Sequence, residues 1–346
     1  MSYADFLCGA ESFVGVGGSI LLLTSGPSEQ ATTKGVTATL HLPGSPDFAA
    51  STPDGLWVAT HGSSSKQNIA SSGQLLHINL ATGTVQQTVP PTGMTSNLAL
   101  DGNRLIADPG IAGTSTAGTA PGELMAVDTR TGRVLARRHE QVAGGPMVVG
   151  DGALWEIQET YARTPTVLRE LNPTTLAPIA PPLTLGATSD THGLAWGGGY
   201  VWASEDDGEV LRIDPATRTI ARAHVGGFPI GIVLAGRSVW VINDSNATVK
   251  RLDPSTLRVI GQPVSVPPGD NYYLGATDGY VFIADDSDGT VTRIDTRTGE
   301  SAGAPIRIAP AATTGYGSAY AIAPAGTAIW ATSPSSDTIS RIQIKP

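Results

Sequence analysis

The chain has 346 residues, of which 21 are Lys or Arg and 30 are Asp or Glu, so its formal net charge at pH 7 is −9. So few basic residues argue against nucleic acid or an anionic membrane as the main partner. The single cysteine, Cys8, excludes an internal disulfide framework and a cysteine-based zinc site. The sequence has no run of 18 apolar residues, so we expect no membrane-spanning helix.

Residues 1–35 do not match the rest of the chain and are expected to form an N-terminal extension, either irregular or containing an extra strand. Within it, the apolar stretch FVGVGGSILLL follows Asp5 and Glu11 and has no Lys or Arg before it. A secretory signal begins with a basic region, so this stretch does not fit one. The default expectation is therefore a cytoplasmic protein, with an extracytoplasmic location as the alternative.

One pattern recurs over residues 36–346. Its clearest copy, EVLRIDPATRTIARAHV, covers residues 209–225 and predicts a short strand, a turn opened by Asp-Pro, and a second strand. The residue that opens the turn returns every 39–49 positions, at Asn79, Asp128, Asn172, Asp214, Asp253, Asp295 and Gln343. A period of this length, built from short strands, is typical of a β-propeller with four strands in each blade.

Seven copies predict an all-β fold, a seven-bladed β-propeller of four-stranded blades. In the fourth copy we expect the strands at HGLAW, YVWAS, VLRID and TIARAHV. The last copy, ISRIQIKP, ends where its outermost strand should begin, and residues 36–42 can supply that strand. The N-terminal strand should therefore close the ring and cover an otherwise open sheet edge, which favours a monomer.

An aromatic residue recurs in the second strand of nearly every copy. The positions are Trp57, Trp155, Trp202, Trp240, Phe282 and Trp330, with Ile106 in the second copy. One large side chain per blade is expected to pack between neighbouring blades. The Asp or Asn that opens each turn is expected to cap it through side-chain to backbone hydrogen bonds. His77, His139 and His224 are expected at the surface.

The signature V-x-R-I-D-P-x-T, preceded by an aromatic-centred strand, resembles the YVTN/YncE-like and NHL-like seven-bladed propellers over about nine-tenths of the chain. The resemblance implies the propeller fold. That broad group includes ligand-binding and scaffold proteins, sensor domains, and enzymes such as lactonases and streptogramin B lyases. No segment matches the catalytic motif of the lyases, so the resemblance assigns no catalytic residue here.

The expected site is the axial funnel, on the face where outer-to-inner connections and second-to-third-strand connections meet. Ten residues before the second-strand aromatic residues stand His192, Tyr272 and Tyr320, whose rings should converge at the funnel rim. Asp206, Asp244 and Asp286 come four residues after Trp202, Trp240 and Phe282 and should lie on the same face. The candidate ligand-binding residues are His61, His192, Asp206, Asp244, Tyr272, Tyr273, Asp286 and Tyr320.

Carboxylates near a histidine can bind a hard cation or have pKa values suited to acid–base chemistry. Asp206, Asp244 and Asp286 are therefore candidate ligands for a divalent cation, Mg²⁺ or Ca²⁺, and His192 is the candidate catalytic base. Turn chemistry alone also explains the individual aspartates, since tight hairpins favour Asp and Gly. No other cofactor is expected.

The sequence favours a binding protein that holds a small molecule, a peptide or a partner protein at the funnel face, because it contains no complete catalytic constellation. The alternative is a metal-assisted lyase or hydrolase, like a streptogramin lyase or a lactonase, with a His–carboxylate site in the funnel. The chain has no G-x-S-x-G elbow, H-E-x-x-H motif, P-loop or Rossmann fingerprint, which argues against those four enzyme classes.

Overall fold

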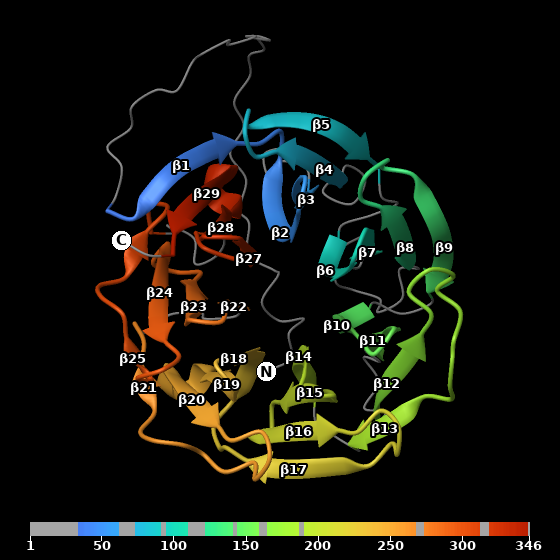
Figure 1. Ribbon diagram of the computed structural model, residues 1–346, viewed down its shortest axis with the longest axis vertical. Helices are drawn as coiled ribbons and strands as arrows, with labels where there is room; N and C mark the ends of the chain where they lie inside the picture. Colours follow the sequence, from blue (N-terminus) through green and yellow to red (C-terminus); the bar gives the residue numbers. More distant parts are fainter. Residues whose placement is uncertain are drawn as a thin grey trace, which may run out of the picture.

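The computed structural model describes residues 34–61, 73–90, 95–109, 122–140, 144–158, 165–186, 190–267, 273–311 and 318–344. These residues form seven sheets arranged as blades around a central axis (Figure 1). The predicted all-β, seven-bladed propeller is therefore confirmed. None of the described residues forms a helix long and apolar enough to cross a membrane.

Each blade contains four strands ordered from the axis to the rim, and blade six has a fifth. Blades one to three consist of β2 (Ser45–Thr52), β3 (Gly55–His61), β4 (Gln74–Asn79) and β5 (Thr84–Val89); β6 (Thr95–Asp101), β7 (Arg104–Pro109), β8 (Gly122–Asp128) and β9 (Val134–Glu140); and β10 (Gly144–Gly150), β11 (Ala153–Gln158), β12 (Thr166–Leu171) and β13 (Leu183–Gly186).

Blades four to seven follow the same plan. They consist of β14 (Thr191–Gly197), β15 (Tyr200–Glu205), β16 (Glu209–Ile213) and β17 (Ile220–His224); β18 (Pro229–Ala235), β19 (Ser238–Asn243), β20 (Thr248–Leu252) and β21 (Val264–Ser265); β22 (Tyr273–Ala276), β23 (Tyr280–Asp285), β24 (Thr290–Asp295), β25 (Glu300–Ser301) and β26 (Ile306–Arg307); and β27 (Ile322–Ala325), β28 (Ala328–Ser333), β29 (Thr338–Gln343) and β1 (Val36–His41).

The ring closes through the N-terminal strand, as expected. β1 pairs antiparallel with β29, with Val36 opposite Ile342 and Leu40 opposite Ile339, and the two strands lie side by side in Figure 1. Just beyond β1, the Leu42 N–H donates to the Asp337 carbonyl at 2.9 Å. Of the expected N-terminal extension, residues 1–33 lie outside the described residues.

The core is divided into seven clusters, each shared by two neighbouring blades. Trp202 of blade four, for example, is fully buried against Val239 and Leu252 of blade five. Its indole N–H donates to the Gly197 carbonyl at 3.0 Å. The other recurring aromatic residues and Ile106 are at most 2% exposed, so their predicted role between blades is confirmed.

The Asp and Asn residues cap their turns as predicted. The Asp214 Oδ1 accepts the backbone N–H groups of Ala216 and Thr217, both at 2.9 Å. Asn79, Asp128, Asn172, Asp253 and Asp295 make the equivalent pair of bonds. Such bonds stabilise the ionised carboxylate, and with the Ser255 hydroxyl they lower the pKa of Asp253 to about 2.

His77 is buried, so the prediction that it lies at the surface was wrong. It is in β4 and is 3% exposed, because its ring stacks on Trp57 with centroids 4.9 Å apart. In blades four to seven the residue opposite the second-strand aromatic residue is an arginine, and in blade one His77 takes that place. His139 and His224 are exposed, as expected.

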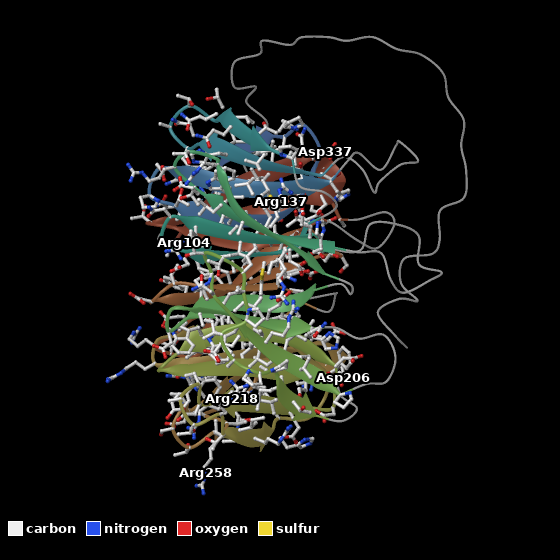
Figure 2. The ribbon with its side chains drawn as sticks, turned by 90° about the vertical axis from the view of Figure 1, so that its right-hand side faces the viewer. Arg104, Arg137, Asp206, Arg218, Arg258 and Asp337 are labelled. Carbon is white, nitrogen blue, oxygen red and sulfur yellow. The ribbon has the colours of Figure 1, made fainter. Side chains whose placement is uncertain are left out.

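Because the strands alternate in direction, the connections lie on two faces of the disc. We call the loop face the side with the outer-to-inner and second-to-third-strand connections, such as 206–208. The turn face carries the first-to-second hairpins and the Asx turns, such as 214–219. Figure 2 shows this division from the side, with Asp206 and Asp337 on the loop face and Arg104, Arg218 and Arg258 on the turn face.

Candidate functional site

The inner strands of blades one to five each contain a register shift near the loop face. In blades one, two, four and five the extra residue is Asp47, Ser96, His192 and Ile230. These are the positions ten residues before the second-strand aromatic residue or Ile106. A β-bulge re-aims the side chain of its extra residue. The counting rule located these positions, but the bulge itself was not predicted.

In blade four, His192 lies beside Asp206. The Asp206 carboxylate is held in place because its Oδ1 accepts the Asp190 N–H at 3.1 Å, while the Asp206 N–H donates to the Asp190 carbonyl at 3.0 Å. The His192 ring contacts Phe228 at a centroid distance of 5.0 Å. Its Nε2 is buried and has no hydrogen-bond partner in the part of the chain that the structure describes.

Burial also sets the protonation states of this pair. Burial lowers the pKa of His192, although the nearby Asp206 and Asp190 carboxylates oppose the shift. Burial likewise raises the pKa of Asp206 above its usual value, against the hydrogen bond from Asp190. At pH 7 His192 is therefore neutral, and its imidazole can accept a proton or a hydrogen bond.

Blade one contains the same two residue types with their positions exchanged. Here the bulge residue is Asp47, and His61 stands where blade four has Asp206. The His61 Nδ1 and the Asp47 Oδ2 are 2.7 Å apart, and this hydrogen bond raises the pKa of His61. Burial raises the pKa of Asp47, which is 9% exposed. Unlike His192, His61 is thus directly paired.

Two of the predicted tyrosines meet at the inner ends of blades six and seven. The Tyr273 hydroxyl donates to the Tyr320 hydroxyl at 2.8 Å, and the ring centroids are 4.3 Å apart. Phe48 of blade one contacts both rings edge-on, at 5.3 and 5.6 Å. The three rings touch one another, so they form a packed platform, which we call the aromatic platform. Phe48 was missed, although it directly follows the bulge residue Asp47.

The structure does not gather all the predicted residues. Among the described residues, ring contacts join His192 to Phe228, on blades four and five, and separately join Tyr320 of blade seven to Tyr273 of blade six and Phe48 of blade one. The convergence of His192, Tyr272 and Tyr320 at the funnel rim stays a prediction. Tyr272 lies outside the described residues.

The candidate cation ligands are spread out as well. Asp286 is buried, at 1% exposed, whereas Asp244 is half-buried in a short 3₁₀ turn, Asp244–Asn246. The described residues contain no group of three or more His, Cys, Asp or Glu side chains arranged to hold a metal ion. Asp206, Asp244 and Asp286 therefore do not form a ligand set for Mg²⁺ or Ca²⁺ in the described part of the chain.

The charge of the described connections on the loop face is one-sided. These connections contain no Lys or Arg, and Arg307, at the end of β26, is paired with Asp288 at 2.9 Å. The same connections carry Asp190, Asp206, Asp207, Asp244, Asp286, Asp288 and Asp337. A cationic group that approaches this face is therefore attracted by several carboxylates.

Two cavities lie away from the axis. One, of about 370 Å³, is at the rim between blades two and three, and Arg138, Arg169 and Leu171 contribute to its lining. The other, of about 380 Å³, is on the turn face between blades one and two, beside Asp54, Asn103 and Arg130. Both cavities therefore lie apart from the axial funnel predicted from the sequence.

The fold is shared with proteins of very different sequence. No protein-family model matches this chain, and no curated protein matches its sequence. Among solved structures, the β-propeller domain of Cps50 (Swd1) from Myceliophteria thermophila is similar, with a TM-score of 0.68 and 13% identity over 90% of this chain and 99% of that chain. Virginiamycin B lyase from Staphylococcus aureus is also similar, with a TM-score of 0.65 and 15% identity over 88% of this chain and 98% of that chain.

At these identities the likeness concerns the fold alone. A computationally designed protein, Ika8, matches at a TM-score of 0.59 and 13% identity, over 88% of this chain and 98% of its own. A designed protein and a lyase thus share one architecture with this chain. Function must therefore be argued from the side chains of the site.

Proposed function

We propose that the protein is a binding module whose loop face holds a small molecule or a peptide through a cationic group. The observation that carries the proposal is the absence of Lys and Arg from the described connections of that face, which carry several carboxylates. The aromatic platform of Phe48, Tyr273 and Tyr320 lies at the axial end of the same face. Carboxylates and aromatic rings together favour an organic cation over a neutral ligand of the same shape.

The charge states of His192 and His61 are consistent with a negatively charged loop face. His192 is neutral at pH 7 because burial lowers its pKa, so it adds no positive charge beside Asp206. His61 is already paired with Asp47, so its charge is compensated within blade one. The loop face therefore keeps its negative potential at neutral pH.

Three probes of equal shape and different charge test the proposal. Benzamidinium is a planar cation, benzamide is its neutral counterpart, and benzoate is its anionic counterpart. We expect benzamidinium to bind at least about tenfold more tightly than benzamide, a difference of about 1.4 kcal/mol in binding free energy. The affinity for benzamidinium should decrease as salt is added. Isothermal titration at two salt concentrations measures this, and equal affinity for benzamidinium and benzamide would contradict the proposal.

We infer further that the chain is a member of the YVTN/YncE-like propellers. The repeated V-x-R-I-D-P-x-T motif supports this, and so does the role of its Asp, or of the Asn in its place, which caps the turn in six blades. The similarity to the virginiamycin B lyase structure agrees with the inference at the level of fold.

A metal-assisted lyase or hydrolase is the second candidate, and one observation favours it. The buried Nε2 of His192, without a hydrogen-bond partner in the described residues, is suited to accept a proton from a bound substrate. Metal analysis of protein purified without chelator tests the metal-dependent form. A stoichiometric ion that the His192→Gln and Asp206→Asn variants lose would support it, and the absence of any bound ion would remove it.

A further inference from the structure

Blade three has an incomplete outer edge. Its fourth strand, β13, spans only Leu183–Gly186, and before it the chain touches β12 through one isolated bridge, Leu171 to Pro178. Pro178, Pro181 and Pro182 occupy this segment, and proline has no N–H to donate to a neighbouring strand. A cavity of about 370 Å³ lies between this segment and residues 138 and 139 of the outer strand of blade two, β9.

Basic side chains line this rim cavity. Arg138, from β9, donates from Nη1 to the Leu176 carbonyl of blade three at 2.8 Å, so its guanidinium spans the two blades. Arg169, whose side chain is only 8% exposed, is fixed by the buried Glu156 at 2.6 Å. His139, on β9, also contributes to the lining.

Arg169 and the acidic residue of the lining are both in ion pairs, so their charges are compensated. Glu170 is paired with Arg218, a turn-face residue of blade four, at 3.2 Å. The remaining lining residues include Leu171, Pro178, Ala180 and Pro182, which are apolar. The cavity thus has a basic wall and an apolar wall, and its volume lies in the range that small-molecule sites occupy.

We propose that this rim cavity binds a small organic carboxylate. Two guanidinium groups held by protein contacts provide the planar donor geometry that suits a carboxylate, and the proline-rich wall receives the apolar part of the ligand. The site is separate from the loop face and selects the opposite charge.

Ligand-observed NMR and isothermal titration with benzoate, benzamide and benzamidinium test the proposal. We expect benzoate to bind at the rim and benzamide to bind at least about tenfold more weakly. The Arg138→Gln variant removes one guanidinium group and should lower the affinity for benzoate about tenfold or more. The Ala180→Leu variant fills the cavity while every charge remains, and it should abolish benzoate binding. Arg258→Gln, an exposed turn-face arginine outside the cavity, is the matched control and should bind benzoate like the parent.

The outcomes are separable. Benzoate binding that survives both Arg138→Gln and Ala180→Leu in folded protein would place the anion elsewhere and overturn the proposal. Equal affinity for benzoate and benzamide would also overturn it, because the basic wall would then have no role. Neither result bears on the loop face, which benzamidinium reports separately, so a failure here leaves the proposed function intact.

Discussion

The two faces of the disc are built from the same strands but carry different chemistry. On the turn face, Asx turns repeat in six blades, and arginines such as Arg218 and Arg258 balance aspartates such as Asp214. On the loop face, the described connections carry carboxylates with no Lys or Arg. The turn face is therefore explained by local backbone requirements alone, whereas nothing in turn chemistry requires the one-sided charge of the loop face. The excess of carboxylates on the described loop-face connections is the feature that indicates a ligand.

The ring that supports both faces depends on β1, so its removal has the largest expected effect. Without residues 1–41, β29 loses its pairing partner, and Ala38 and Leu40 no longer pack on the cluster between blades seven and one. We expect a loss of at least about 3 kcal/mol, the scale of deleting large core side chains. Thermal unfolding and size-exclusion chromatography measure it. A variant without residues 1–30 should be affected less, and a 1–41 deletion that stays monomeric and melts like the parent would show that closure is unimportant.

Buried His77, in blade one, makes the stability of the protein depend on pH. Burial lowers the pKa of His77 below 6.5, and neither ring nitrogen has a hydrogen-bond partner in the described residues. The unfolded chain therefore binds a proton more readily than the folded one. Above pH 6.5, the titration of His77 does not change the free energy of unfolding. As the pH falls from 6.5 toward the folded-state pKa of His77, the free energy of unfolding decreases by up to about 1.4 kcal/mol per pH unit.

Urea unfolding of the parent and the His77→Phe variant between pH 5 and 8 isolates this contribution. The variant should lose part of the acid-side decline in stability, and His139→Gln, which replaces an exposed histidine, is the matched control. An identical pH profile for the parent and His77→Phe would mean that the stacked ring does not remain neutral in the folded protein.

The charge of the loop face can be reduced without changing its shape. Asp206→Asn combined with Asp244→Asn removes two carboxylates, and we expect benzamidinium affinity to fall about fivefold, or about 1 kcal/mol. The matched pair Asp151→Asn and Asp278→Asn removes the same charge from exposed hairpins of the turn face. If both double variants weaken binding equally, net charge alone governs the affinity and the distinction between the faces has no functional meaning.

The smallest effect is expected on the turn face. Asp253→Ala removes two backbone hydrogen bonds and should lower the melting temperature by roughly 1–2 °C, without altering benzamidinium binding. Because the pKa of Asp253 is about 2 in the folded protein, the contribution of its carboxylate is present above pH 4 and is lost as the pH falls toward 2. Weaker ligand binding with unchanged stability would mean that the turns face the functional surface.

The sequence was sufficient for features that depend on local, repeated chemistry. The turn at Asp214, the closure by residues 36–42 and the position of Trp202 between blades all follow from repeated short motifs. His77 was placed wrongly because the third strand is covered by neighbouring blades, which a single repeat does not indicate. The platform formed by Phe48 and Tyr320 depends on blades one and seven meeting across the ring closure, so no local pattern predicts it.

The most direct test of the loop face as the binding surface is the position of a bound organic cation. Crystals of the protein soaked with benzamidinium, with benzoate as the matched anion, would locate both probes. The account predicts benzamidinium on the loop face, in contact with the platform of Tyr273 and Tyr320 or beside the carboxylate of Asp206. Benzamidinium bound reproducibly on the turn face or at the rim, with the loop face empty, would contradict it.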